Sequence, residues 1–279
     1  DAGTAHVKNV AALEQENKRL NAEIERVNRE RIEYLQNVSH QLVAPLNAIK
    51  WHIENITNNR VGVDRAKKVL RSIYSQSTIA VHLAKNFALM SNLDADHSLA
   101  ALREPLQEVN LFTLLINLAD DFQPLGWDKS LKISVIDGKL AAAPQVWAIK
   151  PLISQVFSNI IENAVKYSNR DTEIKIDGAH DVDRDCVSVT ITNYGIPLTK
   201  EDAVKIFDRG YRTVEAKNRY PAGTGFGLYI AKRIMEIHKG SITARTNPSG
   251  GAIFEVVLPV ELLKGKARQR DAKNHSPHR

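Results

Sequence analysis

The sequence predicts a helical dimerisation region followed by an α/β sandwich. Up to about residue 90, apolar residues recur at spacings of three and four, the period of amphipathic helices. Beyond residue 105, short strand patterns are interspersed with helix patterns, without regular βαβ alternation. The length of 279 residues suits about two domains. We expect a coiled-coil helix over 1–30, a helical hairpin over 31–95, an α/β domain over 96–263 and a basic disordered tail over 264–279.

The composition is that of a soluble protein, with 43% apolar and 25% charged residues. The single cysteine, Cys186, excludes an internal disulfide and suits a reducing compartment. No apolar run approaches the roughly 20 residues of a membrane span, and no signal peptide opens the chain. We therefore expect a cytoplasmic protein without a membrane span, or the cytoplasmic part of a larger one, since the chain opens inside a helix pattern.

The net charge of +6 does not indicate nucleic-acid binding. The tail from Lys264 to Arg279 holds six Lys or Arg and one Asp, so it contributes +5 of that charge. The rest of the chain is nearly neutral, and short basic tails are usually solvated. We expect no nucleic-acid partner.

Residues 10–27 follow a heptad repeat. A buried Asn at an a position favours a parallel two-stranded register at some cost in stability. The interpretation is a parallel dimeric coiled coil, with a lone amphipathic helix as the alternative. The a positions are Val10, Asn17 and Ile24, and the d positions are Leu13, Leu20 and Val27.

The helix predicted over 35–56 presents His40 away from its apolar seam. At roughly 100° per residue, His40 lies about 160° from the seam centre and so faces water. Pro45 leaves the carbonyl of Gln41 without its helical partner and predicts a bend beside the histidine. His40 is therefore a candidate functional residue, although an ordinary solvated histidine is the alternative.

A second long helix is predicted over 64–90, after a turn at 58–62. Two long helices joined by a short turn form an antiparallel hairpin whose seam is too exposed to be stable alone. Two hairpins can bury their seams together as a four-helix bundle. The sequence thus predicts a homodimer.

The α/β domain is expected to contain a mixed sheet with helices on one face. Helices are predicted at 111–122, 152–167, 201–207 and 226–238. Strands are predicted at 131–135, 173–177, 187–192, 241–245 and 252–258.

Two asparagines lie four residues apart on one face of the helix predicted over 152–167. Asn is a poor helix former, so Asn159 and Asn163 among apolar neighbours need a reason. Capping or surface polarity is one reading. The other is a pair of oxygen ligands for Mg²⁺, with Lys166 as a charge for phosphate.

Two glycine motifs lie further along the chain. Gly223-Thr-Gly225-Phe-Gly227 leads directly into a predicted helix, whose free N–H groups can bind phosphate. The preceding polar segment 208–222 includes Arg212 and suits a mobile lid over an anion. Asn193 ends a predicted strand and is followed by Gly195, so its side chain can enter a pocket.

Taken together, these segments resemble the conserved boxes of sensor histidine kinases of two-component systems, which carry a GHKL-type ATP-binding domain. The order and spacing agree from Leu35 to Pro259. The segments are 39–46 for the phosphoacceptor box, 159–167 for the N box, 193–198 for the first glycine box, 205–207 for the F box and 223–228 for the second glycine box.

The resemblance implies a protein histidine kinase that uses ATP and Mg²⁺. It implies that His40, beside Gln41, accepts the γ-phosphoryl group and passes it to an aspartate on the receiver domain of a response regulator. It also implies that Asn159 and Asn163 meet Mg²⁺ and that Lys166 meets the phosphates. The other nucleotide-binding positions it implies are Tyr167, Asn193, Gly195, Arg212, Gly223, Gly225 and Gly227.

Three departures from the family pattern motivate an alternative. The residue after the histidine is Gln41 rather than an acid, and Ala44 stands where phosphatase-active members often have Thr or Asn. The first glycine box has Asn193 and Pro197 where Asp and a second Gly are usual. The alternative is a nucleotide-binding pseudokinase or scaffold dimer that regulates a partner without phosphoryl transfer. An ATPase of the same sandwich class is a further alternative, which the aligned His40 box disfavours.

Overall fold

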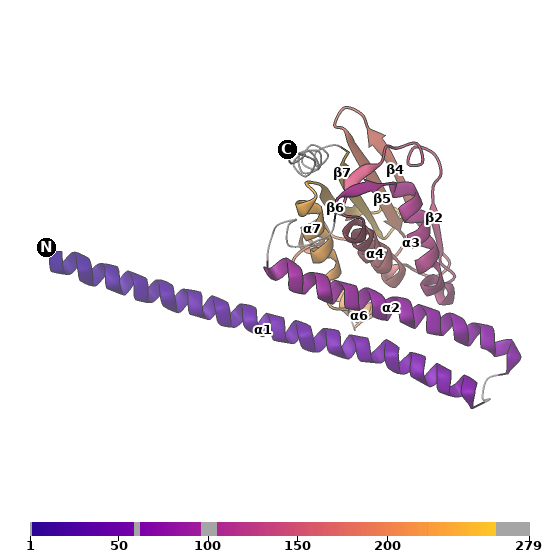
Figure 1. The fold of residues 1–279 in the computed structure, drawn as a ribbon, viewed down its shortest axis with the longest axis horizontal. Coiled ribbons are helices and arrows are strands. Elements are labelled where there is room, and N and C mark those ends of the chain that lie inside the picture. Colours follow the sequence, from indigo (N-terminus) through magenta and orange to yellow (C-terminus); the bar gives the residue numbers. More distant parts are fainter. Residues whose placement is uncertain (1, 59–61, 96–104, 222, 261–279) are drawn as a thin grey trace, which may run out of the picture.

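The computed structural model describes residues 2–58, 62–95, 105–221 and 223–260. The predicted tail over 264–279 therefore lies outside the described residues. The chain begins with two long helices, α1 (Ala2–Thr57) and α2 (Val63–Ala95), which run antiparallel beneath a sandwich of sheet and helices (Figure 1). The hairpin predicted from periodicity is confirmed.

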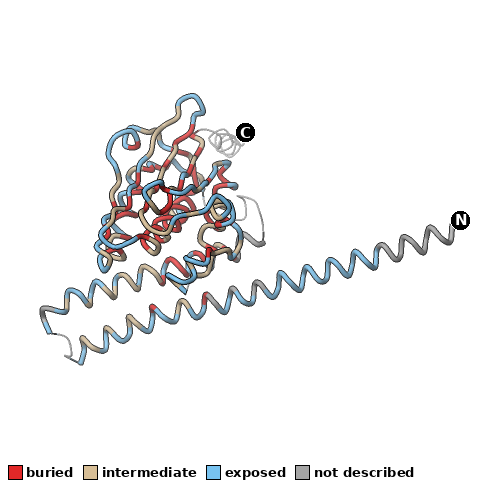
Figure 2. The backbone as a smooth tube through the Cα atoms, turned by 180° about the vertical axis from the view of Figure 1, so that it is seen from behind, coloured by how far each residue is buried: buried red, intermediate tan, exposed pale blue. Residues whose placement is uncertain are grey.

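Helix α1 is continuous from the predicted coil into the hairpin. Pro45 lies inside it, and both backbone views show it nearly straight (Figures 1 and 2). The helix therefore continues through Pro45 without interruption, and no bend is visible there in these two opposite views. Pro45 is buried.

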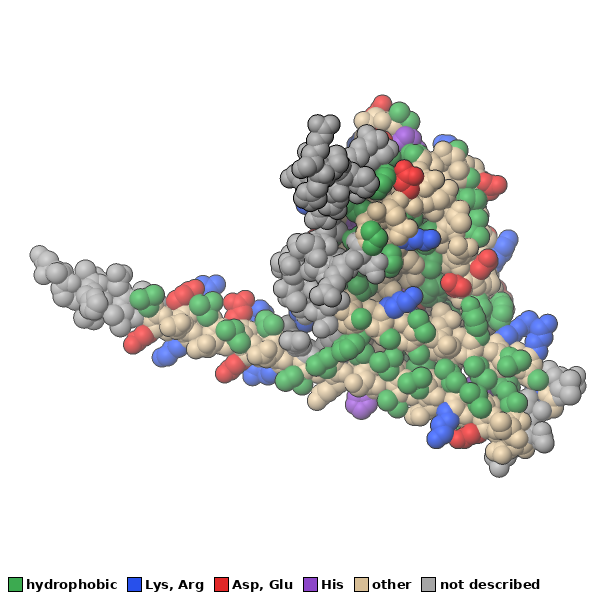
Figure 3. Space-filling view, viewed as in Figure 1, with side chains coloured by type: hydrophobic (Ala, Val, Ile, Leu, Met, Phe, Trp, Pro, Cys, Tyr) green, Lys and Arg blue, Asp and Glu red, His purple; other side chains and the backbone are tan. Residues whose placement is uncertain are grey.

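Much of the apolar surface of the hairpin is exposed in the single chain. Hydrophobic side chains gather along it (Figure 3), and α1 is mostly exposed along its length (Figure 2). This exposure is consistent with the predicted pairing of two copies, which stays a prediction. The exposed side chains are Leu13, Leu20, Ile24, Val27, Ile32, Leu35, Val43, Leu46, Trp51, Ile53, Leu70, Tyr74, Val81 and Phe87.

The second half of the chain contains a five-stranded mixed sheet in the order β2-β4-β5-β7-β6. Strands β2 and β4 are parallel, and the other neighbours are antiparallel, so the predicted mixed sheet is confirmed. Its strands are β2 (Lys132–Val135), β4 (Glu173–Asp181), β5 (Cys186–Asn193), β6 (Ser241–Thr246) and β7 (Ala252–Pro259).

Three helices pack beside this sheet: α3 (Leu111–Gly126), α4 (Lys150–Tyr167) and α7 (Gly227–Ile237) (Figure 1). Buried residues alternate along β5 and β7, as expected for a sheet with one face covered. Phe157, Ile160 and Ile161 of α4 are fully buried in the resulting core.

The short elements differ from the sequence prediction. Strands β1 (Gln107–Val109) and β3 (Val146–Ala148) form a separate two-stranded sheet that was not predicted, because three residues show no readable period. The helix predicted over 201–207 is only α5 (Asp202–Lys205). The predicted lid contains a short helix, α6 (Val214–Arg219), and a 3-10 turn, η2 (Trp127–Lys129), follows α3.

Candidate functional site

A cavity of about 110 Å³ lies where α4, the lid and the glycine loop meet the helical hairpin. Ten of the twelve site residues predicted from the sequence line it, and His40 and Gly195 do not. The ten are Gln41, Asn159, Asn163, Lys166, Tyr167, Asn193, Arg212, Gly223, Gly225 and Gly227.

Helix α4 supplies the polar wall of the cavity. Its apolar residues pack into the core, which leaves Asn159, Asn163 and Lys166 on the cavity side. The amide of Asn159 is only 1% exposed, so its burial requires polar partners. The spacing of four predicted that the two asparagines share a face, and the structure places both at one cavity.

Glu162 forms a buried ion pair inside this wall. Its carboxylate lies 2.8 Å from the Nζ of Lys166. Burial raises the pKa of Glu162, but the charges of Lys166 and His82 outweigh it and the net pKa lies below its usual range. Burial lowers the pKa of Lys166, and Glu162 outweighs that effect, so Lys166 keeps its positive charge at the cavity.

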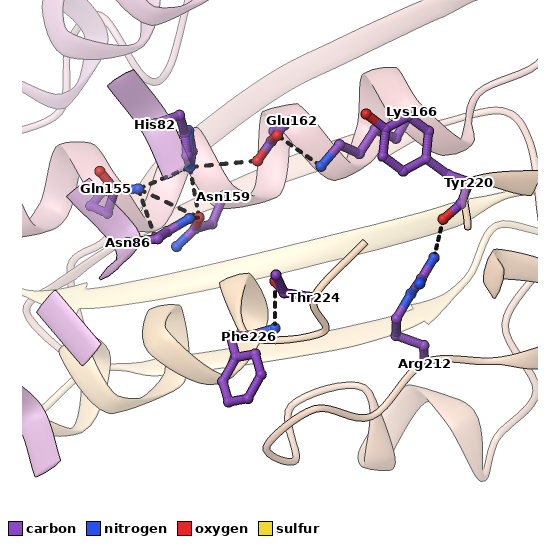
Figure 4. A network of polar contacts seen from close by, with 10 residues as sticks. All are labelled: His82, Asn86, Gln155, Asn159, Glu162, Lys166, Arg212, Tyr220, Thr224 and Phe226. Atoms are coloured by element: carbon purple, nitrogen blue, oxygen red, sulfur yellow. Dashed lines mark hydrogen bonds and ion pairs between the residues drawn. The ribbon is translucent and has the colours of Figure 1, made fainter. Parts of the chain in front are cut away.

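Helix α2 also reaches this wall and binds Asn159 directly (Figure 4). The Oδ1 of Asn159 accepts a hydrogen bond from Asn86 Nδ2 at 2.8 Å. It accepts a second, from His82 Nε2 at 2.8 Å, in the tautomer that carries the proton on Nε2, and Gln155 Nε2 lies 2.9 Å from the same ring nitrogen. Gln155 Nε2 donates to Asn86 Oδ1 at 2.9 Å. The Nδ2 of Asn159 has no hydrogen-bond partner among the described residues. The predicted metal ligand is thus engaged by the hairpin.

The glycine loop packs against the same asparagine. Gly225 has φ +75°, and a Cβ there would lie 2.7 Å from the carbonyl oxygen of Gly210. Gly227 opens α7, and a Cβ there would lie 3.2 Å from Asn159 Oδ1. The loop therefore needs glycine at 225 for its backbone conformation. It also places the N-terminus of α7 beside α4, where free N–H groups can bind an anion.

Arg212 organises the lid from within. Its guanidinium donates to the carbonyls of Ala216 at 2.9 Å, Pro221 at 3.0 Å and Gly223 at 2.8 Å, and also to that of Tyr220. Most of its donors are therefore used by the lid backbone, and the predicted contact with nucleotide stays a prediction.

A second lid arginine ties the lid to the end of α4. Arg219 donates to the carbonyl of Tyr167 at 2.9 Å and to the Oδ1 of Asn169 at 2.8 Å. In addition, the ammonium of Lys166 lies 5.0 Å from the ring centre of Tyr220. The lid thus packs over Lys166 in this structure.

The far end of the cavity is formed where β5 ends. Asn193 lines the cavity and is 3% exposed. Gly195 forms an isolated bridge with Ser168, and a Cβ on it would lie 1.9 Å from the carbonyl oxygen of Tyr167. Gly195 therefore shapes the wall by allowing close backbone approach, without lining the cavity itself.

His40 is exposed on α1, as its position on the helix predicted. Its neighbour Gln41 lines the cavity, so the histidine is one residue from the cavity wall in the same chain.

The residues of the cavity fit Mg²⁺. Two amide side chains on one helix face line it beside Lys166. Mg²⁺ in nucleotide sites takes few protein oxygens and completes its shell with phosphates and water. Among the residues that the structure describes, no group of three or more His, Cys, Asp or Glu could hold a metal ion.

Several residues that line the cavity or lie behind its wall were not identified from the sequence. Glu162 could have been found, because it lies four residues before Lys166 on the same helix. Gln155 has the same relation to Asn159. His82 and Asn86 carried no local signal, because they lie 77 and 73 residues from Asn159 in sequence.

Comparison with known proteins agrees with this geometry. Residues 149–262 match the family model described as histidine kinase-, DNA gyrase B- and HSP90-like ATPase. These residues therefore form an ATP-binding domain of that class.

Relatives with longer chains match most of the sequence. The sensor protein kinase WalK of Staphylococcus saprophyticus is 30% identical over 246 residues, which cover 87% of this chain and 38% of the relative. The sensor histidine kinase WalK of Bacillus subtilis is 29% identical over 239 residues, which cover 85% of this chain and 38% of the relative. This chain thus spans well under half the length of these relatives.

A solved structure shares the fold. Full-length ShkA in complex with AMPPNP aligns with a TM-score of 0.53 and 19% identity, covering 81% of this chain and 45% of that one. This likeness is one of fold. The family model and the relatives support a sensor histidine kinase with an ATP-binding domain of that class. None of the described helices is both long and apolar enough to cross a membrane.

Proposed function

We propose that this chain is the kinase core of a sensor histidine kinase. It binds ATP with Mg²⁺ in the α4 cavity, transfers the γ-phosphoryl group to His40, and passes it to an aspartate on the receiver domain of a response regulator. The observation that supports this best is that Gln41, next to His40, lines the same cavity as Asn159, Asn163 and Lys166.

The reaction needs positioning and charge more than covalent chemistry from the protein. Asn159 and Asn163 hold the cation, which neutralises phosphate charge when bound. Lys166 contributes a fixed positive charge, and the N–H groups at the start of α7 bind phosphate oxygens. A ring nitrogen of neutral His40 attacks the γ-phosphorus. The bond between that phosphorus and the β–γ bridging oxygen breaks, and ADP leaves.

Gln41 and Asn193 decide how efficient this reaction is. The amide oxygen of Gln41 accepts a hydrogen bond from the other ring nitrogen of His40, without the charge that a carboxylate would add. Asn193 binds the adenine end through its amide oxygen, again without a charge, so we expect the affinity for ATP to be modest. These two residues are also what favours the pseudokinase as a second candidate.

The active unit is a homodimer in this proposal, because the exposed seam of α1 and α2 is covered when two hairpins pair. We place the core in the cytoplasm, as the cytoplasmic part of a longer sensor, since the related kinases are much longer.

The test is labelling of the chain with γ-labelled ATP. We expect acid-labile, base-stable phosphate on the wild type and none on His40→Ala. His52→Ala is the matched control, because His52 lies on the same helix but does not line the cavity. Its Nε2 is hydrogen-bonded to Ser72 Oγ at a distance of 2.9 Å. Undiminished phosphate on His40→Ala contradicts the assignment. ATP binding without any phosphohistidine favours the pseudokinase.

A further inference from the structure

We propose that α2 acts as an intramolecular competitor of the divalent cation, by holding the side-chain oxygen of Asn159 with His82 and Asn86. In this docked state the oxygen of Asn159 cannot coordinate the cation. Binding of the cation with nucleotide releases Asn159 from α2. The proposal rests on the proposed function, in which Asn159 is a cation ligand.

The lone pairs of Asn159 carry the first step of the argument. An amide oxygen has two acceptor positions. Asn86 Nδ2 occupies one at 2.8 Å, and His82 Nε2 occupies the other at 2.8 Å in the tautomer with the proton on Nε2. A cation bound to the same oxygen would face two hydrogen-bond donors, whose positive ends repel it. Coordination by Asn159 and docking by α2 therefore exclude one another.

The fit of the contact carries the second step. His82, Asn86, Gln155 and Asn159 are all buried, so the four side chains form a specific network (Figure 4). The Nδ2 of Asn159 is left without a partner among the described residues, so the docked state does not satisfy this amide completely. Such a contact is stable without ligand but can be displaced by a better one.

The rest of the docked interface combines buried apolar packing with exposed polar contacts. Met90 of α2 is buried in the same core as the domain, and the ring of Phe122 lies 5.7 Å from that of His82. Arg71 lies 4.4 Å from the ring centre of Trp127, and Tyr74 Oη lies 3.5 Å from Asp121 Oδ1. Tyr74 and Trp127 are exposed, where such contacts contribute little. The contact at Asn159 therefore adds a buried polar contribution to this apolar packing, and its loss weakens the docking of the domain on α2.

Competition of this kind is reciprocal. If docking weakens cation binding by some factor, the cation with nucleotide weakens docking by the same factor. Nucleotide without the cation does not need the oxygen of Asn159 and should be far less sensitive to α2. The dependence on the cation distinguishes competition at Asn159 from simple obstruction of the cavity.

The experiment is calorimetry on the full chain with a non-hydrolysable ATP analogue, once with Mg²⁺ and once with excess EDTA. Asn86→Leu removes one donor at similar volume. We expect it to tighten binding with Mg²⁺ about tenfold, which is about 1.4 kcal/mol, and to change binding in EDTA less than about twofold. Ser77→Ala is the matched control on the exposed side of α2 and should leave both affinities unchanged.

A pair of substitutions at His82 gives an independent reading if Asn86→Leu does not fold. His82→Gln keeps a donor and should resemble the wild type, whereas His82→Phe removes it and should tighten binding with Mg²⁺. X-ray scattering should show a larger radius of gyration for the wild type with Mg²⁺ and analogue than with EDTA and analogue.

The outcomes separate the two proposals. Equal gains with Mg²⁺ and with EDTA, or no gain in either folded variant, overturn the competition while leaving nucleotide binding in place. No binding of the analogue by the wild type at millimolar concentration overturns the proposed function, and this inference with it.

Discussion

Lys129 is expected to hold the end of α4 in place, and its removal tests that idea. Its Nζ donates to the carbonyl oxygens of Val165 at 2.8 Å, Lys166 at 2.7 Å and Ser168 at 3.4 Å. The last four carbonyls of a helix have no partners within the helix, so Lys129 satisfies groups at the end that borders the cavity. Burial lowers the pKa of this lysine, and the charges of Arg219 and Arg170 lower it further.

The magnitude follows from these bonds. A hydrogen bond from a charged donor contributes about 1.5–3 kcal/mol, and a cation at a helix C-terminus adds about 0.3–1 kcal/mol. The partial desolvation of the ammonium offsets part of the gain from the two short bonds. We expect Lys129→Met, which keeps the apolar stem, to lower the free energy of unfolding by about 2–3 kcal/mol. For a domain of this size the melting temperature should fall by about 4–12 °C.

The assay is urea unfolding of the full chain, followed by the circular dichroism of the folded domain. Lys132→Met is the matched control, because the side chain of Lys132 is 77% exposed and its Nζ lies 4.0 Å from Glu173. We expect the control to change stability by less than about 0.5 kcal/mol. A loss below about 0.5 kcal/mol for Lys129→Met as well would refute the reasoning that these carbonyls need the lysine.

Three further predictions concern single residues. Neutral His238 accepts from the N–H of Ile149 at 3.1 Å, and burial lowers its pKa below 6.5 although the Ile234 carbonyl opposes this. Its contribution to stability is thus present above pH 6.5 and lost as pH falls from there through the folded-state pKa. The free energy of unfolding should therefore fall less between pH 7.5 and pH 5.5 in His238→Gln than in the wild type. Gly195→Ala should destabilise the domain by roughly 3 kcal/mol or prevent folding, because the added Cβ would lie 1.9 Å from a backbone oxygen. The control Gly62→Ala, whose Cβ would meet no atom within 4 Å, should change thermal stability little. Gln41→Glu should speed autophosphorylation at saturating ATP by roughly 10-fold or more, since a carboxylate can stabilise the charged ring; an unchanged rate would exclude that role.

The sequence by itself determined the elements whose cause is local. The spacing of apolar residues predicted α1, α2 and α4, because a helix brings residues three and four apart onto one face. The same rule placed Asn159 and Asn163 on one side of α4, and both line the cavity. The glycines of the loop before α7 were recognisable because only close backbone approach or positive φ requires them there.

Only the tertiary structure decided how these parts meet. The bonds of Lys129 to the end of α4 and of Arg219 to Tyr167 join segments at least 36 residues apart, and no local pattern distinguishes these side chains from solvated ones. The same holds for His82 and Asn86, which carried no local signal in the sequence. They bind Asn159 because the domain folds back onto α2, and that arrangement depends on the packing of whole surfaces rather than on any short stretch of sequence.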